Sequence, residues 1–530
     1  MKKTPIYWLL TLVVLVTSSC DSFLDINTNP NQATSASAEL VLPQAIVASA
    51  AQSSAYNSYG AHFGGYMANA GGFSGFGALL NYNLVPGDYN NLWVNTYDNL
   101  QDYRYVIDQT EGVSGQEYFN ATAKIMTVLN YQRLVDAFGD VPYTEALQGS
   151  TIRTPKYDNA ATIYQDLVDQ LDKAIAAIDA AKFPVALNSS SDPLFKGNMT
   201  TWKQFANTLK LRLLVRMSGV AALSSFVTTK FTALDKTLGF ITTDAIVNPG
   251  YLKQTNQQNP TWNAWGYTVA GALSNSSRIP TQFAFGFYKG QKLTDNGRGG
   301  VIYKNFATTT PVNQLGNEAN APTIVTNYST WYSGIFNSAS SITDALGVLK
   351  GPSMGQPLML AAESHFLQAE ARLKSYIPGD VAASFNEGIT QSFTYLYKDV
   401  TNVPGAGKNV AADVAAYKTA NPADNANSFL VNIALATTDA QRLEAIITQK
   451  YIALNMVNSD EGWNEYRRTG FPRTNPTGNG FTNIASNKSN STRPDKLPTR
   501  ILYPSSEQSY NSANFKPVNQ FSDLIFWDPN

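Results

Sequence analysis

The strongest constraint on the fold is a set of long segments in which apolar residues recur every three or four positions. Between residues 160 and 181, Ile163, Leu167 and Leu171 share one face, and aspartates occupy the opposite face. A stripe of this kind predicts a helix that buries one side. Related patterns predict further helices over residues 38–55, 88–109, 120–138, 201–218, 357–376 and 439–457. We therefore expect a mainly α-helical protein.

The segments between these helices have a different composition. They are rich in Gly, Asn, Ser, Thr and Pro and sustain no period, which predicts long loops with a few short strands over residues 57–87, 240–356, 400–430 and 470–520. Paired helices joined by short polar turns favour a TPR-like helical-repeat scaffold, although no consensus recurs at the period of about 34 residues typical of that motif. Loops this long usually carry function, so binding residues should be sought in them.

Local signals predict where the helices begin and end. Thr201 followed by Gln204 is a capping-box pattern, which predicts that a helix begins there. Gly139 can end the helix over 120–138 in a left-handed cap, and Pro142 prevents that helix from restarting. Three tryptophans on predicted helices are assigned to the core, namely Trp93, Trp202 and Trp463.

The first twenty residues have the pattern of an export signal. Lys2 and Lys3 precede an apolar run from Ile6 to Val16, and small polar residues lead into Cys20, the only cysteine. The apolar run would rise only about 16 Å as a helix, which is too short to span a bilayer. The residues before Cys20 resemble a bacterial lipobox and predict cleavage there, with acyl chains added to the cysteine. The expected parts are a signal peptide (1–19), a lipidated tether (20–37) and one folded domain (38–530).

The composition excludes several classes of partner and site. A formal net charge of −1 gives no long-range attraction for nucleic acid or for an anionic membrane surface. With Cys20 acylated, no thiol is left for catalysis, zinc binding or an iron–sulfur cluster. Charged residues form only 15% of the chain and aromatic residues 12%, a balance that suits neutral polar ligands such as sugars. A neutral protein that faces the outside of the cell explains the same numbers equally well.

Motifs for catalysis are missing or incomplete. The two histidines, His62 and His365, stand outside any metal-binding spacing. The closest match to a nucleophile elbow, Gly72–Gly75, is followed by Phe76 where the last glycine is needed. Glycosidase carboxylates have no fixed spacing in sequence, so a glycoside hydrolase stays open.

Glu363 and Glu370 share one predicted helical face, with His365 between them in sequence. They could form a catalytic or metal-binding pair. Carboxylates at this spacing more often accept hydrogen bonds from arginine on a neighbouring helix, and we favour that interpretation. We therefore assign no catalytic residue, metal ligand or cofactor. A structural calcium ion in the acidic and amide-rich loops stays open, although no EF-hand spacing is present.

Four groups of segments form an ordered set of motifs along the chain. They are CDSFLDINTNPN (20–31), DAFGDVPYTEA (136–146), DPLFKGN with WKQFANTLKLR (192–198 and 202–212), and AE, FLQAEA, QKYIAL and WNEYRRTGFP (362–363, 366–371, 449–454 and 463–472). In this order and after a lipobox, they resemble the SusD/RagB family of outer-membrane nutrient-binding lipoproteins, particularly its starch-binding-associated branch. The resemblance spans nearly the whole chain.

The resemblance implies a function that the residues alone do not specify. Members of this family capture ligands and leave cleavage to other proteins, which implies a lipoprotein without catalytic activity on the surface of the outer membrane. It also implies a partner, a SusC-like TonB-dependent barrel whose extracellular mouth the lipoprotein covers as a lid. An oligosaccharide is the expected ligand. A peptide-capturing member of the same family and a surface glycoside hydrolase are the alternatives.

Aromatic residues in the long loops are the candidate ligand contacts. A flat ring packs against the apolar face of a sugar or a peptide side chain, and amides or arginine at the rim fix its orientation. Each ring contributes about 1–2 kcal/mol by buried area, which predicts weak and reversible capture. The candidates are Trp262, Trp265 and Trp331 with Tyr251, Tyr267 and Tyr332, and, in the glycine-rich segment 60–82, Tyr66, Phe73, Phe76 and Tyr82.

Overall fold

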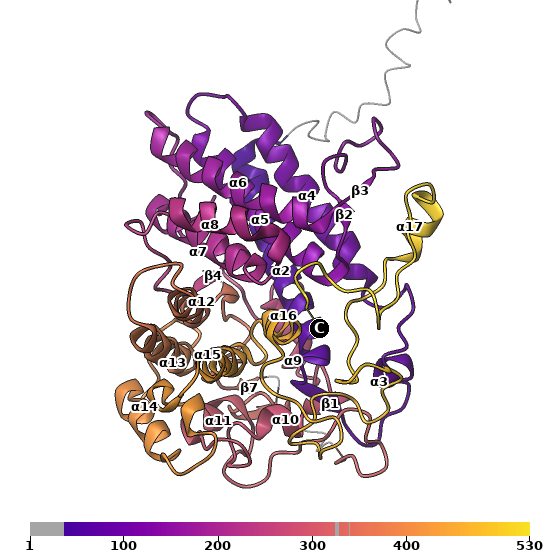
Figure 1. Cartoon of the computed structure of the whole chain (residues 1–530), viewed down its shortest axis with the longest axis vertical. Coiled ribbons are helices and arrows are strands. Elements are labelled where there is room, and N and C mark those ends of the chain that lie inside the picture. Colours follow the sequence, from indigo (N-terminus) through magenta and orange to yellow (C-terminus); the bar gives the residue numbers. More distant parts are fainter. Residues whose placement is uncertain (1–35, 324–327, 339, 530) are drawn as a thin grey trace, which may run out of the picture.

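The computed structural model describes residues 36–323, 328–338 and 340–529. The signal segment, Cys20 and nearly all of the tether lie outside these residues, so the expectations about them stay predictions. Helices dominate the regular structure, and the prediction of a mainly helical protein is confirmed (Figure 1). No helix in the described ranges has both the length and the apolar character needed to cross a membrane.

The N-terminal half builds a row of helices that forms the upper part of Figure 1. It comprises α2 (Ala38–Phe63), α4 (Asn90–Thr110), α5 (Glu117–Phe138), α6 (Ala160–Ala180), α7 (Met199–Met217), the short η1 (Ala221–Leu223) and α8 (Ser224–Ala233), and the short α3 (Ala78–Asn81) lies apart from it, at the lower right of Figure 1. Long helices that follow one another along the chain pack together, α2 on α4, α4 on α5, α5 on α6, and α6 on α7. This succession is the arrangement expected of a helical-repeat scaffold.

The C-terminal half extends this row and closes it. It comprises α9 (Pro260–Trp265), α10 (Gln282–Phe285), α11 (Asn296–Ile302), α12 (Ala361–Leu373), α13 (Val381–Tyr397), α14 (Val410–Thr419), η2 (Ser428–Leu430), η3 (Ile433–Leu435), α15 (Asp439–Leu454), α16 (Ser459–Thr469) and α17 (Ser505–Tyr510). α7 packs on α12, α12 on α13 and α15, and α15 on α16, which returns to α2. α16 therefore lies between the two halves, at the centre of Figure 1.

The strands are short and tie distant loops together. Four antiparallel pairs are present in the described residues, β1 (Met67–Asn69) with β5 (Arg278–Pro280), β2 (Val141–Pro142) with β3 (Tyr157–Asp158), β4 (Ala245–Val247) with β8 (Gln356–Met359), and β6 (Phe336–Ser338) with β7 (Ser341–Ile342). The prediction that the strands are few and short is confirmed for the described residues.

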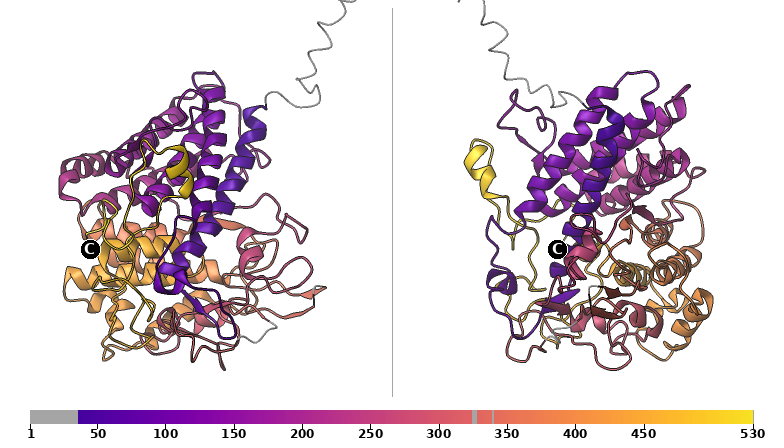
Figure 2. Two further views of the ribbon diagram at one scale, coloured as in Figure 1. Left: turned by 90° about the vertical axis from the view of Figure 1, so that its right-hand side faces the viewer. Right: turned by 180° about the vertical axis from the view of Figure 1, so that it is seen from behind.

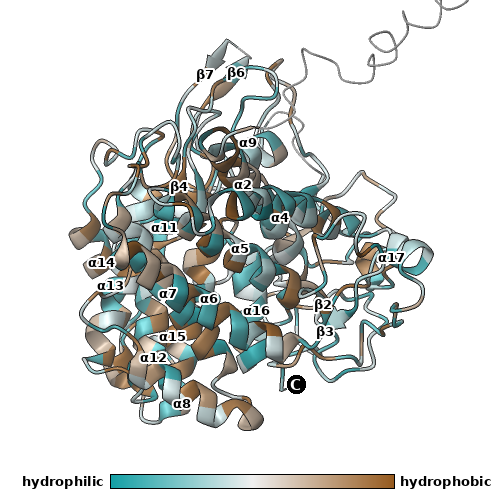
Figure 3. Cartoon of the chain, turned by 90° about the horizontal axis from the view of Figure 1, so that it is seen from above, coloured by the Kyte–Doolittle hydropathy of each residue, from teal (hydrophilic) through white to brown (hydrophobic). Residues whose placement is uncertain are grey.

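α6 shows how the sequence pattern becomes a packed helix. Its buried side chains, among them Ile163, Leu167 and Leu171, lie on one face. Asn159 caps the first turn, because its side chain accepts hydrogen bonds from the backbone N–H groups of Ala161 and Thr162. Figure 3 shows hydrophobic and hydrophilic residues side by side on the helix ribbons, as expected for helices that bury only part of their surface.

Charged side chains from several helices meet in the interior where the row closes. The guanidinium of Arg216 in α7 lies 2.6 Å from the carboxylate of Asp136 in α5 and 2.5 Å from that of Glu461 in α16. Lys450 in α15 lies 3.0 Å from Glu465 in α16. All five side chains are buried. Asp136, Lys450 and Glu465 belong to the motifs that carry the family resemblance, and Arg216 and Glu461 lie just outside those motifs.

Glu363 and Glu370 in α12 belong to the same network. Arg212 donates to Glu363 at 3.1 Å, and Arg468 donates to the two carboxylate oxygens of Glu370 at 2.7 and 2.6 Å. The prediction that these carboxylates accept hydrogen bonds from arginine on neighbouring helices is confirmed. Burial alone would raise the pKa of Glu370, but the charges of Arg468 and Lys374 outweigh that effect and lower the pKa below its ordinary value.

Asp192 organises the turn that leads into α7. Its buried carboxylate accepts hydrogen bonds from the backbone N–H groups of Leu194, Phe195 and Gly197 and, at 2.8 Å, from the indole N–H of Trp202. Buried polar groups are rarely left without such partners. The spacing of aspartate, glycine and tryptophan in this motif is therefore explained by local structure.

We expect Asp192→Ala to lower the free energy of unfolding by about 2–4 kcal/mol, because several buried N–H donors lose their acceptor. Asp235→Ala is the matched control. Asp235 also accepts from two backbone N–H groups in a turn, but it is exposed, so the expected cost is under about 1 kcal/mol. Urea unfolding followed by circular dichroism measures both variants, and equal losses would contradict the assigned role.

α2 is longer than predicted, since it continues to Phe63 through part of the expected loop 57–87. Gly60 is a loop signal in the sequence, yet it lies within this helix. A Cβ atom at Gly60 would come within 2.0 Å of the backbone nitrogen of Asp460. The glycine is needed for the close packing of α2 on α16, which a local pattern does not reveal.

Two predicted helix ends differ from the structure. α7 begins at Met199, with the Asn198 side chain accepting from the backbone N–H of Thr201, so the predicted capping box is wrong. An earlier cap residue competes successfully with the threonine. Gly139 does follow α5 with a positive φ, but at φ +78° and ψ −126° it lies outside the predicted left-handed helical region. The three tryptophans assigned to the core are buried as predicted, namely Trp93, Trp202 and Trp463.

α13 and α14 are helices that the sequence pattern does not predict, and α14 lies within the expected loop 400–430. α13 contains Gly388, which lowers intrinsic helix propensity. A Cβ atom at this position would lie 2.5 Å from the ring of Phe366. The close packing of α12 on α13 thus favours glycine inside the helix, against its local preference.

Candidate ligand-binding site

The loops that carry the candidate aromatic residues meet on one side of the molecule. β1 pairs with β5, and beyond it the backbone N–H of Ala70 donates to Ser277 at 2.9 Å and that of Gly71 donates to Pro322 at 2.9 Å. The left view of Figure 2 shows these loops projecting beyond α2, to the lower right. We call the combined segments 65–82, 262–280 and 313–323 with 328–336 the loop face.

Five of the candidate residues come together in one aromatic cluster of the loop face. Trp262 lies 5.2 Å from Tyr332 and 5.9 Å from Tyr267, measured between ring centroids, and Trp265 lies 5.5 Å from Trp331. The ring of Tyr267 also stacks on Phe336 at 3.9 Å. Aromatic pairs at these separations stabilise one another, so the cluster acts as a small core for the loops.

The other candidate rings also pack inside the protein, with one exception. Tyr66 stacks on Tyr451 at 4.2 Å, and its hydroxyl donates to the carbonyl of the same residue. The hydroxyl of Tyr82 accepts from the backbone N–H of Ser486. Tyr251 and Phe76 are buried as well.

Burial corrects one part of the hypothesis that flat aromatic rings in the loops contact the ligand. Nine of the ten candidate rings are buried and present no open face, namely those of Trp262, Trp265, Trp331, Tyr251, Tyr267, Tyr332, Tyr66, Phe76 and Tyr82. Partners for these rings come from segments far away in sequence, such as Tyr451 for Tyr66, so composition alone does not separate packed rings from exposed ones. Eight of these residues support the loop face, and Tyr251 lies outside it. A direct contact between any of the nine and a ligand stays a prediction.

Phe73 is the one candidate ring that is open to solvent, with 41% of its surface exposed. It lies between Gly72 and Gly75, both of which have a positive φ. A Cβ atom added at either glycine would meet no atom within 4 Å, so the loop is free of neighbours at these positions. An exposed ring on such a loop can pack against the apolar face of a ligand.

Arg278 provides a cation beside this loop. Its guanidinium lies 4.1 Å from the centroid of the Phe76 ring, and its Nη1 atom is buried without a hydrogen-bond partner in the described residues. Burial lowers the pKa of Arg278 to about 10. At neutral pH the guanidinium stays protonated. Because its Nη1 atom has no partner among the described residues, it can donate a hydrogen bond to a ligand oxygen.

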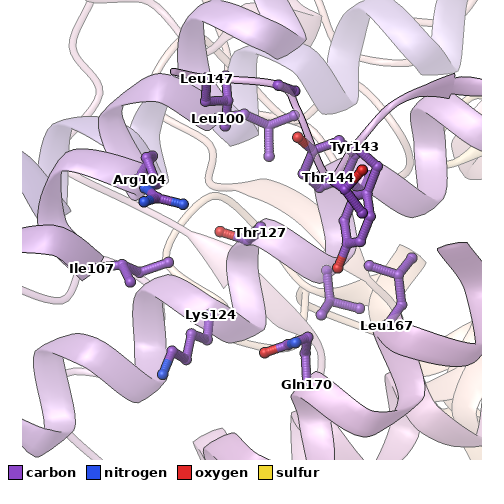
Figure 4. Close-up of a pocket in the computed structure, with 13 residues that line it drawn as sticks. Leu100, Arg104, Ile107, Lys124, Thr127, Tyr143, Thr144, Leu147, Leu167 and Gln170 are labelled. Carbon is purple, nitrogen blue, oxygen red and sulfur yellow. The ribbon is translucent and has the colours of Figure 1, made fainter. Parts of the chain in front are cut away.

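A separate cavity of about 270 Å³ lies among α4, α5, α6 and the loop after β2 (Figure 4). Figure 4 shows Leu100 and Ile107 of α4 on one side of it and Tyr143 and Leu167 on the other. The hydroxyl of Tyr143 donates to Asp166 at 2.5 Å. Burial raises the pKa of this tyrosine, so it stays a neutral donor.

The charges around this cavity do not select a ligand. Arg104 pairs with Asp108 at 2.8 Å, and Lys124 pairs with Glu111 at 2.7 Å, so both cations are neutralised. Sequence reasoning missed the cavity because residues 143–146 were assigned only to a helix-ending motif. The signal that could have indicated it is the mixture of polar and apolar residues at the end of this motif, from Tyr143 to Ala146, and in Leu147 directly after it.

The described residues form no cluster of metal-binding side chains. They contain no group of three or more His, Cys, Asp or Glu side chains close enough to hold a metal ion. The Nε2–H group of His62 donates to the carbonyl of Leu79 at 2.8 Å, and burial lowers the pKa of His62 to about 3. His62 is therefore neutral at physiological pH.

Two family models match this chain. The first, described as "Starch-binding associating with outer membrane", covers residues 30–276, and the second, described as "Susd and RagB outer membrane lipoprotein", covers residues 327–523. Together they account for most of the sequence. The chain belongs to the SusD/RagB family. The resemblance inferred from the four groups of motifs is therefore confirmed, and with it an outer-membrane protein family.

Solved structures of SusD-like proteins share the fold. A SusD-like protein from Bacteroides thetaiotaomicron VPI-5482 is 23% identical, with a TM-score of 0.67 over 93% of this chain and 99% of that one. A chitin-binding SusD homologue from Flavobacterium johnsoniae is 21% identical, with a TM-score of 0.64 over 88% and 92%. A protein described as chitin-binding is 22% identical, with a TM-score of 0.65 over 93% and 99%. No match was found among curated proteins. At these identities the likeness establishes the SusD-like helical fold.

Proposed function

We propose that this SusD/RagB protein captures an oligosaccharide at its loop face and delivers it to a SusC-like TonB-dependent barrel, without catalysis. The observation that carries the proposal is the open Phe73 ring on a glycine-bracketed loop, in a chain of this family. Two structural neighbours are chitin-binding proteins, which supports a carbohydrate as ligand. Acyl chains on Cys20 would hold the protein on the outer membrane, facing the cell surface.

Phe73→Ala is expected to weaken oligosaccharide binding by roughly 5- to 30-fold, because one stacking ring contributes about 1–2 kcal/mol. Phe183→Ala is the matched control, since Phe183 is 89% exposed but follows α6, among the helices of the N-terminal half. Isothermal titration with chito-, malto- and cello-oligosaccharides measures both variants. Equal affinities for Phe73→Ala and the unmodified protein would remove Phe73 from the site.

The same titrations decide between ligand classes. Tri- to hexapeptides replace the saccharides in a second series, and binding of peptides alone would favour the peptide-capturing alternative. Incubation with each saccharide followed by product analysis tests for hydrolysis, and a cleaved product would contradict the absence of catalysis. Affinity purification of the native protein from detergent-solubilised membranes tests the partner, for which co-purification of a TonB-dependent barrel is expected.

A further inference from the structure

A cavity apart from the one in Figure 4 opens between α15, the loop around η2 and the segment after α16. It has a volume of about 360 Å³, within the range of about 300–1,000 Å³ found for small-molecule sites. One wall carries the aromatic ring of Phe287, and the others carry hydroxyl and amide groups that can bond to sugar hydroxyls, from Asn427, Thr448, Thr474, Asn475 and Thr482.

Lys292 lines this cavity without a carboxylate partner among the described residues. Its ammonium nitrogen lies 3.1 Å from the ring centroid of Phe283 and 4.0 Å from that of Phe287, and it donates one hydrogen bond, to the carbonyl of Phe283 at 3.2 Å. No carboxylate lies within ion-pair distance of it in the described part of the chain. Burial lowers the pKa of Lys292, and no neighbouring charge opposes this effect. An ammonium group in this position gains stability from an anion that enters the cavity.

A second cation stands at the mouth of the same cavity. The Nε atom of Arg473 lies 2.8 Å from Glu444, and the Arg473 side chain is 68% exposed. Its remaining guanidinium N–H groups can form paired hydrogen bonds to a carboxylate or a sulfate. Lys292 and Arg473 together outweigh Glu444, the one acidic residue in the lining. The cavity therefore has a net charge of +1 when all three groups are ionised.

We propose that this cavity binds the anionic group of an acidic sugar, either a carboxylate or a sulfate ester, with Lys292 as the inner charge and Arg473 as the outer one. The Phe287 ring packs against the sugar, and the surrounding amides and hydroxyls bond to its hydroxyl groups. The proposal rests on the carbohydrate-binding function proposed above and adds acidic sugars to its ligands. It also gives the protein a second contact point for a glycan, separate from Phe73.

The test compares D-glucuronate and D-glucose 6-sulfate with D-glucose and inorganic sulfate, by titration of the full-length protein at low ionic strength. We expect the two acidic sugars to bind at least about tenfold more tightly than glucose, since hydrogen bonds to charged groups are the stronger ones. Lys292→Met removes the charge while keeping an apolar chain of similar length, and it should abolish this preference. Arg473→Gln should reduce the preference several-fold. Lys182→Gln, at an exposed position after α6, is the control and should leave it unchanged.

Thermal unfolding of each variant shows whether the fold is kept, and Arg473→Gln changes a mostly exposed side chain that does not hold the core. A folded Lys292→Met variant that keeps the wild-type preference would overturn the proposal. Inorganic sulfate that binds as tightly as glucose 6-sulfate would overturn it too, because the site would then hold a free anion. Titration with neutral oligosaccharides distinguishes failure of the acidic-sugar site from failure of the proposed oligosaccharide binding. If they bind while acidic sugars show no advantage, only this proposal fails, and if no saccharide binds, the proposed function fails.

Discussion

Arg216→Met is expected to lower the free energy of unfolding by about 3–5 kcal/mol, the cost of breaking a buried ion pair by removing one partner. The guanidinium lies 2.6 Å from Asp136, 2.5 Å from Glu461 and 3.4 Å from Glu465. Its removal leaves three buried carboxylates with one fewer cation. Methionine keeps much of the side-chain volume, so the loss of charge rather than of packing dominates the effect. Urea unfolding followed by tryptophan fluorescence measures the change.

Arg104→Gln provides the matched control for this prediction. Arg104 also pairs with an aspartate, Asp108, at 2.8 Å, but both side chains are about half exposed. Exposed pairs contribute about 0–1 kcal/mol, so a small loss is expected. In the buried network, burial alone would raise the pKa of Glu461, but the charges of Arg212, Arg216 and Lys450 lower it to about 2, so this carboxylate is ionised at neutral pH. Similar losses for the two arginine variants would show that the buried network does not hold the helices together.

Cys20→Ser is expected to move the protein completely from the membrane fraction to the soluble fraction. The residues before Cys20 resemble a lipobox, and serine cannot take up the thioether-linked acyl chains. Each buried methylene contributes about 0.8 kcal/mol and stable anchoring needs more than one chain, so the loss of all chains should abolish binding. Fractionation of cells and metabolic labelling with a palmitate analogue measure the change.

Ser19→Ala serves as the control for the anchor. It keeps a small residue directly before the cysteine, so processing and labelling should persist. A Cys20→Ser protein that stays in the membrane fraction and still takes up label would contradict lipidation at this residue. A variant that loses its label but stays membrane-bound would show that another contact holds the protein at the membrane.

The helical scaffold could be predicted in large part from local pattern. The segment 160–181 forms α6 because its apolar stripe repeats at the helical period and Asn159 caps its start. The exceptions have a common cause. Gly60 and Gly388 are poor helix residues that lie inside helices because another element packs against them at close range. Local preference fails where a contact with a distant segment decides the residue type.

The candidate site could be predicted only as a region. The glycine-rich and aromatic loops do gather on one face, but nine of the ten rings selected there are buried. A glycine beside an aromatic residue indicates a loop, yet it carries no information on what covers the ring. Tyr66 is covered by Tyr451, which follows it by 385 residues in the chain. Exposure is a property of the complete fold, so Phe73 could be singled out only from the structure.

By itself, the sequence determined most of the long helical segments and the ordered motifs that place the chain in the SusD/RagB family, and it predicts an export signal that ends at the lone cysteine. These features depend on the spacing of residues close together along the chain. The tertiary structure alone decided that Asp136, Arg216 and Glu461 form one buried network, that Phe73 is open, and that Lys292 lines a cavity with no carboxylate within ion-pair distance in the described residues. The physical reason is that burial and charge pairing depend on tertiary contacts between distant segments, and local periodicity does not specify those contacts.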